Sequence, residues 1–289
     1  MALGPTRPAE RILVGYSVFV LAIALWRWQA GLEHMGWVVA AYLLIFALVG
    51  LLTVPGQVGP LLRGLAPIAI LLAVYGSLDL LSGFGAAPTH DTTVRRWEVA
   101  LFGREIARTW WQTAPSRFWS TVFHGAYLAY YLVVPAPIVF FAVRRSGQDL
   151  DRVATALLAV FAACYVVFIL LPVAGPYYEY PRPAAWFLAN PAAQLSYGIL
   201  SGGSSYGAAF PSSHVAGTWA AAGAAWLGNR RLGTVLLMPA LLLSVGVVYC
   251  QMHYGVDALG GVAVGAGGVL LAHRLHPRTT TSDRSAPDN

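Results

Sequence analysis

Long apolar runs alternate with short polar segments along the whole chain. Each run has roughly 15–23 residues, about the length that an α-helix needs to cross ~30 Å of hydrocarbon. The pattern predicts an all-α fold, a polytopic membrane helical bundle with about eight transmembrane helices. Their approximate extents are 12–28, 37–54, 65–83, 121–143, 153–171, 214–228, 232–250 and 254–273.

The first run, 12–28, is compatible with either a signal peptide or a membrane anchor. Arg7 and Arg11 precede it, as basic residues precede the apolar part of a signal peptide. Trp26 and Trp28 end it like an aromatic belt at the membrane interface, and the small-residue cleavage pattern is unconvincing. We therefore favour an anchor.

The polar segments indicate one domain rather than several. We expect residues 1–276 to form a single integral membrane domain and the polar tail 277–289 to be disordered. The longest polar stretch, 84–120, contains "VRRWEVALFGREIARTWWQ", in which arginine, glutamate and tryptophan recur at nearly helical spacing. This spacing predicts an amphipathic helix in the membrane interface, with a solvated loop as the alternative.

Composition agrees with a membrane protein, since 57% of the residues are hydrophobic, 10% are charged and the mean hydropathy is +0.62. All 18 basic residues are arginines scattered between the apolar runs, so the net charge of +6 indicates topology rather than a nucleic-acid surface.

With a cytoplasmic N-terminus, eleven arginines fall in inner segments and seven in outer ones. This count places the loop 172–213 and the turn 250–254 on the extracytoplasmic face. The alanine-rich composition fits a bacterial-type plasma membrane.

Two histidines stand at that face beside apolar runs. In "AAFPSSHVAGTW", Pro211 and two serines precede His214 at the start of a predicted helix. In "CQMHYGVDALGG", His253 and Asp257 are four residues apart, which places them on one face of a helix. At this spacing a carboxylate holds one ring nitrogen and the other nitrogen stays available.

These residues suit phosphoryl transfer through a histidine nucleophile. One imidazole attacks phosphorus while the other protonates the departing alcohol. The backbone amides of Ser212, Ser213 and His214 are expected to point outward at the helix start, as a site for an anionic oxygen. Each histidine alone is better explained as a structural ring at a helix end, whereas the two rings together with Asp257 indicate catalysis.

The motifs "PSSH" at 211–214 and "HYGVD" at 253–257 resemble the second and third signature motifs of the phosphatidic acid phosphatase type 2 superfamily. Within it, "FPSSHVA" and "YCQMHYGVDALGG" are most similar to the inositol phosphorylceramide synthase branch. The resemblance covers roughly 120–273, and it implies a six-helix core of that family's kind with the catalytic part in this range.

By this resemblance, His253 is the nucleophile that becomes phosphorylated, Asp257 orients it, and His214 is the general acid for the leaving group. Ser212 and Ser213 would bind the phosphoryl oxygens. Histidine and aspartate are also residue types that bind metal ions, but nothing in the spacing requires a metal, and the resembled family works without one.

The chain departs from the family pattern where the family carries positive charge. An arginine usually stands six residues before the third-motif histidine, and here that residue is Val247. The glycine usual before the second-motif histidine is Ser213. Gly175 falls where the first motif has a lysine, and only Arg182 with Pro183 matches the rest of that motif. Arg182 is therefore the predicted cation for the phosphate.

Other polar residues fall on the same side and are candidates for a headgroup pocket. Asp79 lies near the outer end of the third run, where it is either functional or a carboxylate that reaches the lipid headgroups. In "VFHGAYLAYYLV", His124, Tyr127 and Tyr131 recur at i, i+3 and i+7. One face of the fourth run therefore lines a pocket or forms an aromatic belt.

The loop "GPYYEYPRP" adds further candidates. Tyr177, Tyr178 and Glu179 precede Arg182, and the prolines stiffen the backbone between them. The adjoining "SGGSSYG" at 201–207 is either a flexible flank that admits a bulky headgroup or an ordinary linker.

The sequence therefore predicts a membrane lipid phosphatase or phosphotransferase that acts on a phospholipid or lipid phosphate at the extracytoplasmic face, through a phosphohistidine. Because water and a polyol use the same catalytic residues, an inositol-phosphate transferase with inositol as acceptor is the alternative. A non-catalytic transporter or scaffold is the third. We expect no cofactor, no metal ion and no nucleic-acid partner.

Overall fold

The computed structural model describes residues 4–56, 58–82, 85 and 88–277. Within these residues the regular structure is helical, with one isolated β-bridge between Val173 and Ala208. Apart from Pro277, the tail that we expect to be disordered lies outside the described residues. The helices are α1 Pro8–Gln29, α2 Met35–Leu52, α3 Pro60–Ala73, α4 Ser77–Leu81, α5 Asp91–Phe102, α6 Ile106–Thr113, α7 Arg117–Val133, α8 Pro135–Val143, α9 Gly147–Leu170, α10 Pro176–Glu179, α11 Ala185–Leu188, α12 Pro191–Gly203, α13 Ser213–Gly228, α14 Arg230–Tyr249 and α15 Gly255–Leu275.

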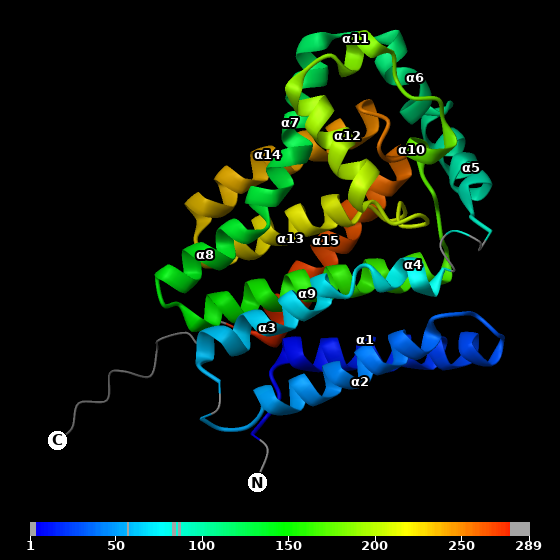
Figure 1. The fold of residues 1–289 in the computed structure, drawn as a ribbon. Coiled ribbons are helices and arrows are strands. Elements are labelled where there is room, and N and C mark those ends of the chain that lie inside the picture. Colours follow the sequence, from blue (N-terminus) through cyan, green and yellow to red (C-terminus); the bar gives the residue numbers. More distant parts are fainter. Residues whose placement is uncertain (1–3, 57, 83–84, 86–87, 278–289) are drawn as a thin grey trace.

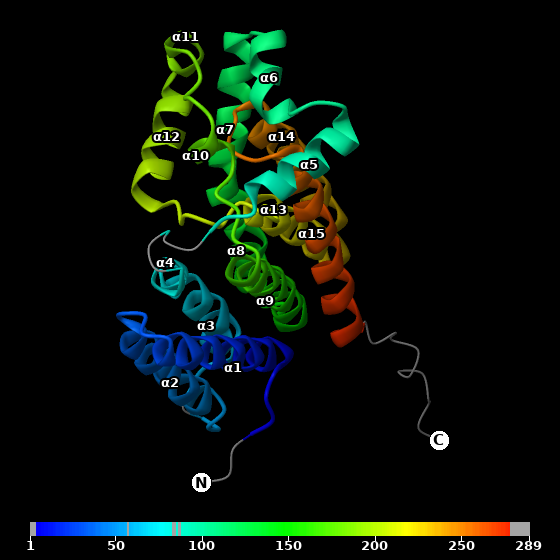
Figure 2. The same cartoon turned by 90° about the vertical axis from the view of Figure 1, so that its right-hand side faces the viewer.

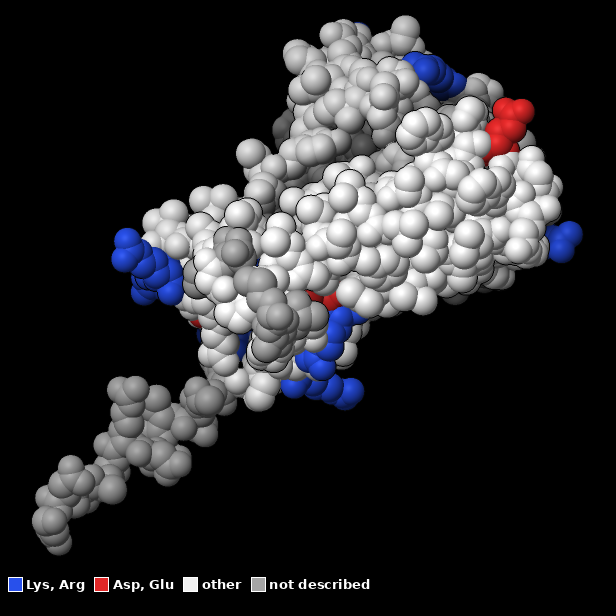
Figure 3. All heavy atoms as spheres, turned by 60° about the horizontal axis from the view of Figure 1, so that its bottom comes forward, with Lys and Arg blue, Asp and Glu red and all other residues white. Residues whose placement is uncertain are grey.

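Six helical segments of the described chain are long and apolar enough to cross a membrane, namely α1, α2, the α7–α8 pair, α9, α14 and α15. Each coincides with a predicted run, so the all-α polytopic fold is confirmed. Figure 3 shows a broad face that is uncharged along most of its length, with charged residues at its ends. This distribution suits a surface covered by lipid tails.

The other two predicted runs form shorter helices. α3 has 14 residues and ends at Ala73, and a turn through Gly76 then leads to the short α4. α13 has 16 residues, because the side chain of Ser212 caps its start and Asn229 already caps the start of α14. The third run is therefore divided by a turn, and the sixth is a short helix inside the bundle.

α9 lies in the middle of the bundle, where it packs against α1, α3, α13 and α15 (Figure 1). Of the 18-residue apolar window of α9, 72% is buried, against 33–44% of the matching windows in the other five segments. α13 packs closely on α15, because a Cβ on Gly261 would lie 2.6 Å from the Ser212 oxygen and one on Gly265 would lie 2.7 Å from Trp219 Cβ. α1 and α2 pack side by side on the opposite flank of α9 (Figure 2).

Short helices gather where α13 and α15 begin (Figures 1 and 2). α5 and α6 replace the single amphipathic helix predicted in 84–120, because Gly103 between them takes a left-handed φ of 73°. α10, α11 and α12 belong to the loop segment after α9. Gln251, in the turn after α14, donates from Nε2 to the Pro181 oxygen at 2.8 Å, so the two segments that we expect on one face do meet.

Candidate active site

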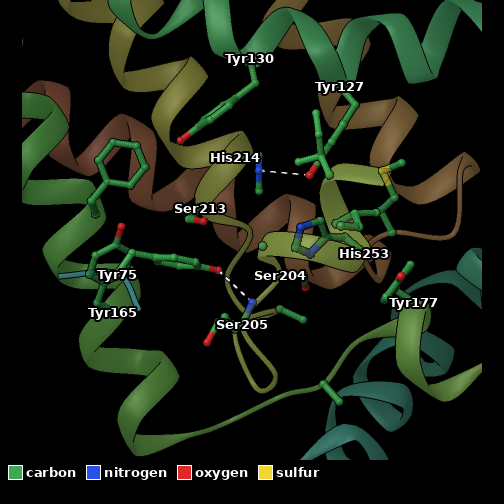
Figure 4. A pocket seen from close by; sticks show the side chains of 18 of the residues that line it. Tyr75, Tyr127, Tyr130, Tyr165, Tyr177, Ser204, Ser205, Ser213, His214 and His253 are labelled. Atoms are coloured by element: carbon green, nitrogen blue, oxygen red, sulfur yellow. Dashed lines mark hydrogen bonds between the residues drawn. The ribbon is translucent and has the colours of Figure 1, made fainter. Parts of the chain in front are cut away.

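The two motif histidines, His214 and His253, line one cavity of about 260 Å³ (Figure 4). His214 lies in the first turn of α13, and His253 lies in the turn between α14 and α15. Their ring centroids are 6.2 Å apart. The fold thus brings together the two rings that the sequence motifs single out.

The turn that carries His253 is held by its own backbone and by neighbouring segments. The amides of Met252 and His253 both donate to the Val247 oxygen, at 2.9 and 3.0 Å. Gln251 has a left-handed φ of 58° and is 2% exposed, and its Oε1 accepts from Trp111 Nε1 of α6 at 3.0 Å. These bonds fix the position from which the His253 ring projects.

Asp257 is hydrogen-bonded to the His253 ring, although the two residues do not share a helix face as expected, because α15 begins at Gly255. Its fully buried carboxylate accepts at Oδ2 from His253 Nδ1 at 3.3 Å and from the Tyr254 amide at 2.8 Å. The tautomer that donates from Nδ1 leaves Nε2 as the nitrogen available for chemistry. Burial lowers the pKa of His253 to about 4, so the ring is neutral near pH 7.

The His214 ring contacts two tyrosines of α7. Its Nε2 is 3.3 Å from the Tyr127 hydroxyl. The ring centroids of Tyr127 and Tyr130 are 5.0 and 4.5 Å from that of His214. Because a phenol hydroxyl can donate or accept, it can hold the ring in either protonation state.

The two serines of the second motif take different positions. Ser213 lines the cavity in the first turn of α13, where backbone amides have no intrahelical acceptor. Ser212 is fully buried, and its amide donates to the backbone carbonyl oxygen of Asp257 at 3.0 Å. The expectation that this amide points outward is therefore wrong, because it joins α13 to α15. The amides of Ser213 and His214 are the ones that remain for an anion.

Seven tyrosines line the cavity within the described part of the chain. Four of them stand at positions that the sequence analysis singled out: Tyr127, Tyr131, Tyr177 and Tyr178. Three were missed: Tyr75, Tyr130 and Tyr165. Tyr130 directly precedes Tyr131, whereas Tyr75 and Tyr165 come from segments that no motif connects.

Asp79 and His124, both predicted for the pocket, do not line the cavity. Asp79 Oδ1 accepts from the Ser205 hydroxyl at 2.6 Å, and Ser205 does line it, so the carboxylate lies directly behind the wall. His124 is fully buried elsewhere, with Nδ1 2.7 Å from the Ser120 oxygen. The structure brings Asp79 near the cavity and leaves His124 in the core.

Arg182 and Glu179 lie beyond the wall. Arg182 Nη2 donates to the Tyr177 hydroxyl at 3.1 Å, and its guanidinium carbon is 5.5 Å from the centre of that ring. Since Tyr177 lines the cavity, the predicted phosphate-binding arginine is one side chain away from it. Glu179 is exposed and does not line the cavity.

Two buried carboxylates of α5 were missed by the sequence analysis. Asp91 is 4% exposed and accepts from the Gly175 amide at 2.8 Å and from the Tyr254 hydroxyl at 3.0 Å. Glu98 is fully buried and accepts from the Val256 amide at 3.1 Å, at the start of α15. Their spacing of i and i+7 puts them on one face of α5, and that spacing was the available signal.

The profile of the PAP2 superfamily matches residues 93–271. The chain belongs to the PAP2 superfamily. This superfamily includes phosphatases and phosphotransferases. The PAP2 match runs from α5 into α15, so it begins before the predicted catalytic part, 120–273, and takes in most of α5. Searches of curated proteins and of solved structures found no match.

Two positions at which we expect a cationic side chain in the PAP2 motifs have no room for one in this chain. Gly175 has a φ of 89°, and a Cβ there would lie 2.7 Å from Ala209 Cβ, so a lysine does not fit. Val247 is fully buried, and its backbone oxygen accepts from the amides of the turn that carries His253. The cavity wall carries no arginine among the residues that the structure describes. Nor do three or more His, Cys, Asp or Glu side chains of the described chain converge as a metal site.

Proposed function

We propose that this PAP2 protein is a membrane lipid phosphatase or phosphotransferase that works through a phosphohistidine at His253. One observation carries the proposal: two imidazoles 6.2 Å apart line one cavity, and a buried carboxylate holds one of them. A single ring at a helix end is better explained by structure, but a pair in a cavity supplies both a nucleophile and an acid.

Transfer takes two steps. In the first, the lone pair of His253 Nε2 attacks phosphorus, and the Nε2–P bond forms as the P–O bond to the leaving alcohol breaks. His214 gives its proton to that oxygen. In the second, water or an acceptor hydroxyl attacks phosphorus, His214 takes a proton back, and the Nε2–P bond breaks. Asp257 stabilises the positive charge on the His253 ring.

The backbone amides at the start of α13, together with Arg182, stabilise the negative charge of the phosphoryl oxygens. The Ser213 and His214 amides lie at the N-terminus of α13, where the helix dipole favours an anion. The Ser213 hydroxyl adds a donor at the wall. Arg182 donates to the Tyr177 hydroxyl and adds its positive charge to the phosphate site from outside the wall.

The substrate is an amphiphilic phospholipid or lipid phosphate. The cavity lies between α7, α9 and α13, so a lipid tail enters between helices while its phosphate meets His253. The arginine count of the connecting segments supports an extracytoplasmic site in a plasma membrane.

Transfer of the phosphoryl group to a polyol such as inositol, similar to the inositol phosphorylceramide synthase branch, is the second candidate. The extent of the cavity favours it, because the cavity reaches from His253 to Tyr75 and Ser205 (Figure 4). This space exceeds what a bare phosphate needs.

The test compares the detergent-purified protein with His253→Ala and His214→Ala on a panel of lipid phosphates and phospholipids, with and without inositol. His273→Ala, which removes an exposed histidine, is the matched control. Release of phosphate from a monoester, or of a phosphorylated headgroup from a diester, without a polyol and lost in His253→Ala, supports hydrolysis. An inositol phosphate formed only with inositol, or an inositol lipid where the headgroup alcohol is the leaving group, supports the transferase. Activity that survives in His253→Ala contradicts the proposal, and a chain inactive on every lipid fits a transporter or scaffold.

A further inference from the structure

The wall of the cavity has a composition that discriminates between phosphate esters. Within the described chain it presents seven tyrosines, three serines and two histidines, and no arginine. A phosphate monoester carries nearly two negative charges at pH 7, and burying them without a wall cation is costly. A phosphodiester carries one negative charge, which costs less to bury, so the wall favours a phosphodiester over a monoester.

A carboxylate lies behind one side of this wall. Asp79 is half-buried and accepts a hydrogen bond of 2.6 Å from Ser205, whose side chain lines the cavity. Among the ion pairs of the described residues, none involves Asp79. A carboxylate without a cation partner, close to a wall of low polarity, attracts a ligand cation and repels a second anionic charge.

Aromatic rings form the wall on the Asp79 side. Tyr75 and Tyr165 have centroids 5.6 Å apart at an interplanar angle of 51°, and the Tyr75 hydroxyl accepts from the Ser205 amide. Figure 4 shows these two tyrosines on the side of the cavity opposite His253. Aromatic faces attract quaternary ammonium groups, because the ring quadrupole is negative above the plane.

We infer that the cavity binds the headgroup of a zwitterionic phosphodiester lipid, with a quaternary ammonium against Tyr75 and Tyr165 near Asp79 and the phosphate beside His253. This inference rests on the proposed function and names its substrate class. The two ends of the cavity then match the two charges of the ligand. The amides at the start of α13 lie at the anionic end, and the tyrosines with the carboxylate lie at the cationic end.

This arrangement keeps the headgroup on the enzyme between the two steps. The His253 Nε2–P bond forms, the bond from phosphorus to the lipid alcohol oxygen breaks, and that oxygen takes the proton of His214. The phosphorylated headgroup stays bound through its ammonium. Water or an acceptor alcohol then attacks phosphorus, gives its proton to His214 and releases His253.

The test measures binding, so that it does not depend on turnover. The full chain, in a maltoside detergent that carries no choline, is titrated calorimetrically with glycerophosphocholine. A second titration uses the 3,3-dimethylbutyl ester, in which carbon replaces the ammonium nitrogen. We expect glycerophosphocholine to bind about tenfold more tightly or better, because cation–π contacts and Asp79 act favourably on the ammonium group, which the dimethylbutyl ester lacks.

Variants separate the contributions of the carboxylate and the rings. Asp79→Asn keeps an oxygen for the Ser205 hydroxyl, so it should weaken glycerophosphocholine binding about tenfold and should not weaken binding of the dimethylbutyl ester, whose only charge is the phosphate. Tyr75→Phe should keep the discrimination, and Tyr75→Leu should reduce it. Equal affinity for the two esters would overturn the inference. So would tighter binding of glycerophosphoinositol, or an Asp79→Asn variant that weakens both esters alike.

Turnover of phosphatidylcholine by wild type and His253→Ala keeps the two proposals distinguishable. Discrimination between the esters, together with turnover that survives in His253→Ala, means that the ammonium site stands and the phosphohistidine proposal fails. Turnover that depends on His253, together with equal affinity for the two esters, means that the phosphohistidine proposal stands and the ammonium site fails.

Discussion

Replacing Asp91 tests whether a buried carboxylate holds the loop after α9 against the turn that carries His253. Its Oδ2 accepts from the Ala174 amide at 2.9 Å, and its Oδ1 accepts from the Gly175 amide at 2.8 Å and from the Tyr254 hydroxyl at 3.0 Å. The residue is 4% exposed, so water cannot replace these bonds. Two segments that flank His253 therefore depend on one side chain.

The size of the effect follows from the number of donors left without an acceptor. Asp91→Asn keeps the shape but turns one oxygen into an NH₂ group that faces a buried N–H, which costs about 1–3 kcal/mol. The bonds that remain lose their charge assistance, which adds about 1 kcal/mol. Tyr254→Phe removes a donor together with its bond, so it leaves no orphaned amide. We expect it to cost about 1.5 kcal/mol.

Thermal unfolding of the detergent-purified protein, together with kcat/KM on its lipid substrate, measures this effect. We expect Asp91→Asn to lower the Tm by about 5 °C or more, with Tyr254→Phe clearly milder. Activity should fall in the same order, because a loosened turn misplaces the His253 ring. An Asp91→Asn variant with wild-type Tm and activity, or a Tyr254→Phe variant that is the worse of the two, would refute the reasoning.

Three further predictions concern the site itself. His214→Ala should lower kcat about 10²–10⁴-fold. The loss should be smallest for substrates with more acidic leaving alcohols, because these alcohols leave without a proton donor. Steady-state rates on a series of leaving groups measure this dependence. Only the neutral His253 ring attacks, and burial lowers its pKa to about 4, so kcat/KM should fall as the pH falls through about 4. A pH–rate profile in which kcat/KM instead falls near pH 6.5, and in which His253 is the titrating group, would contradict this prediction. Gly175→Ala, with its Cβ 2.7 Å from Ala209 Cβ at a φ of 89°, should destabilise the protein by about 1–3 kcal/mol. The control Gly198→Ala, which meets nothing within 4 Å in α12, should not lower the Tm and should raise it slightly, because alanine favours a helix.

Hydrophobic periodicity predicted the spans because a membrane helix must be apolar for about 20 residues whatever it packs against. It failed where local backbone chemistry intervened. The third run turns after Ala73, and nothing in its hydropathy marks the turn. The amphipathic segment divides at Gly103, whose left-handed φ is typical of a glycine that ends a helix.

The spacing of His253 and Asp257 predicted that the two side chains meet, and they form a hydrogen bond. The expected reason, a shared helix face, is wrong, because α15 begins at Gly255 and His253 lies in the turn before it. The cavity wall could not be predicted in this way. Tyr75 and Tyr165 reach it only because α9 packs against α3 and α13, which is a property of tertiary packing. The inward amide of Ser212 likewise depends on the contact between α13 and α15.

The phosphorylated intermediate tests the central claim most directly. The protein is mixed with a phospholipid radiolabelled at phosphorus, quenched within the turnover time, digested and mapped. The account predicts a label that is labile in acid and stable in alkali, on the peptide that contains His253 and absent from His253→Ala. A wild-type enzyme that turns over without such a label, or a label that persists in His253→Ala, would contradict it.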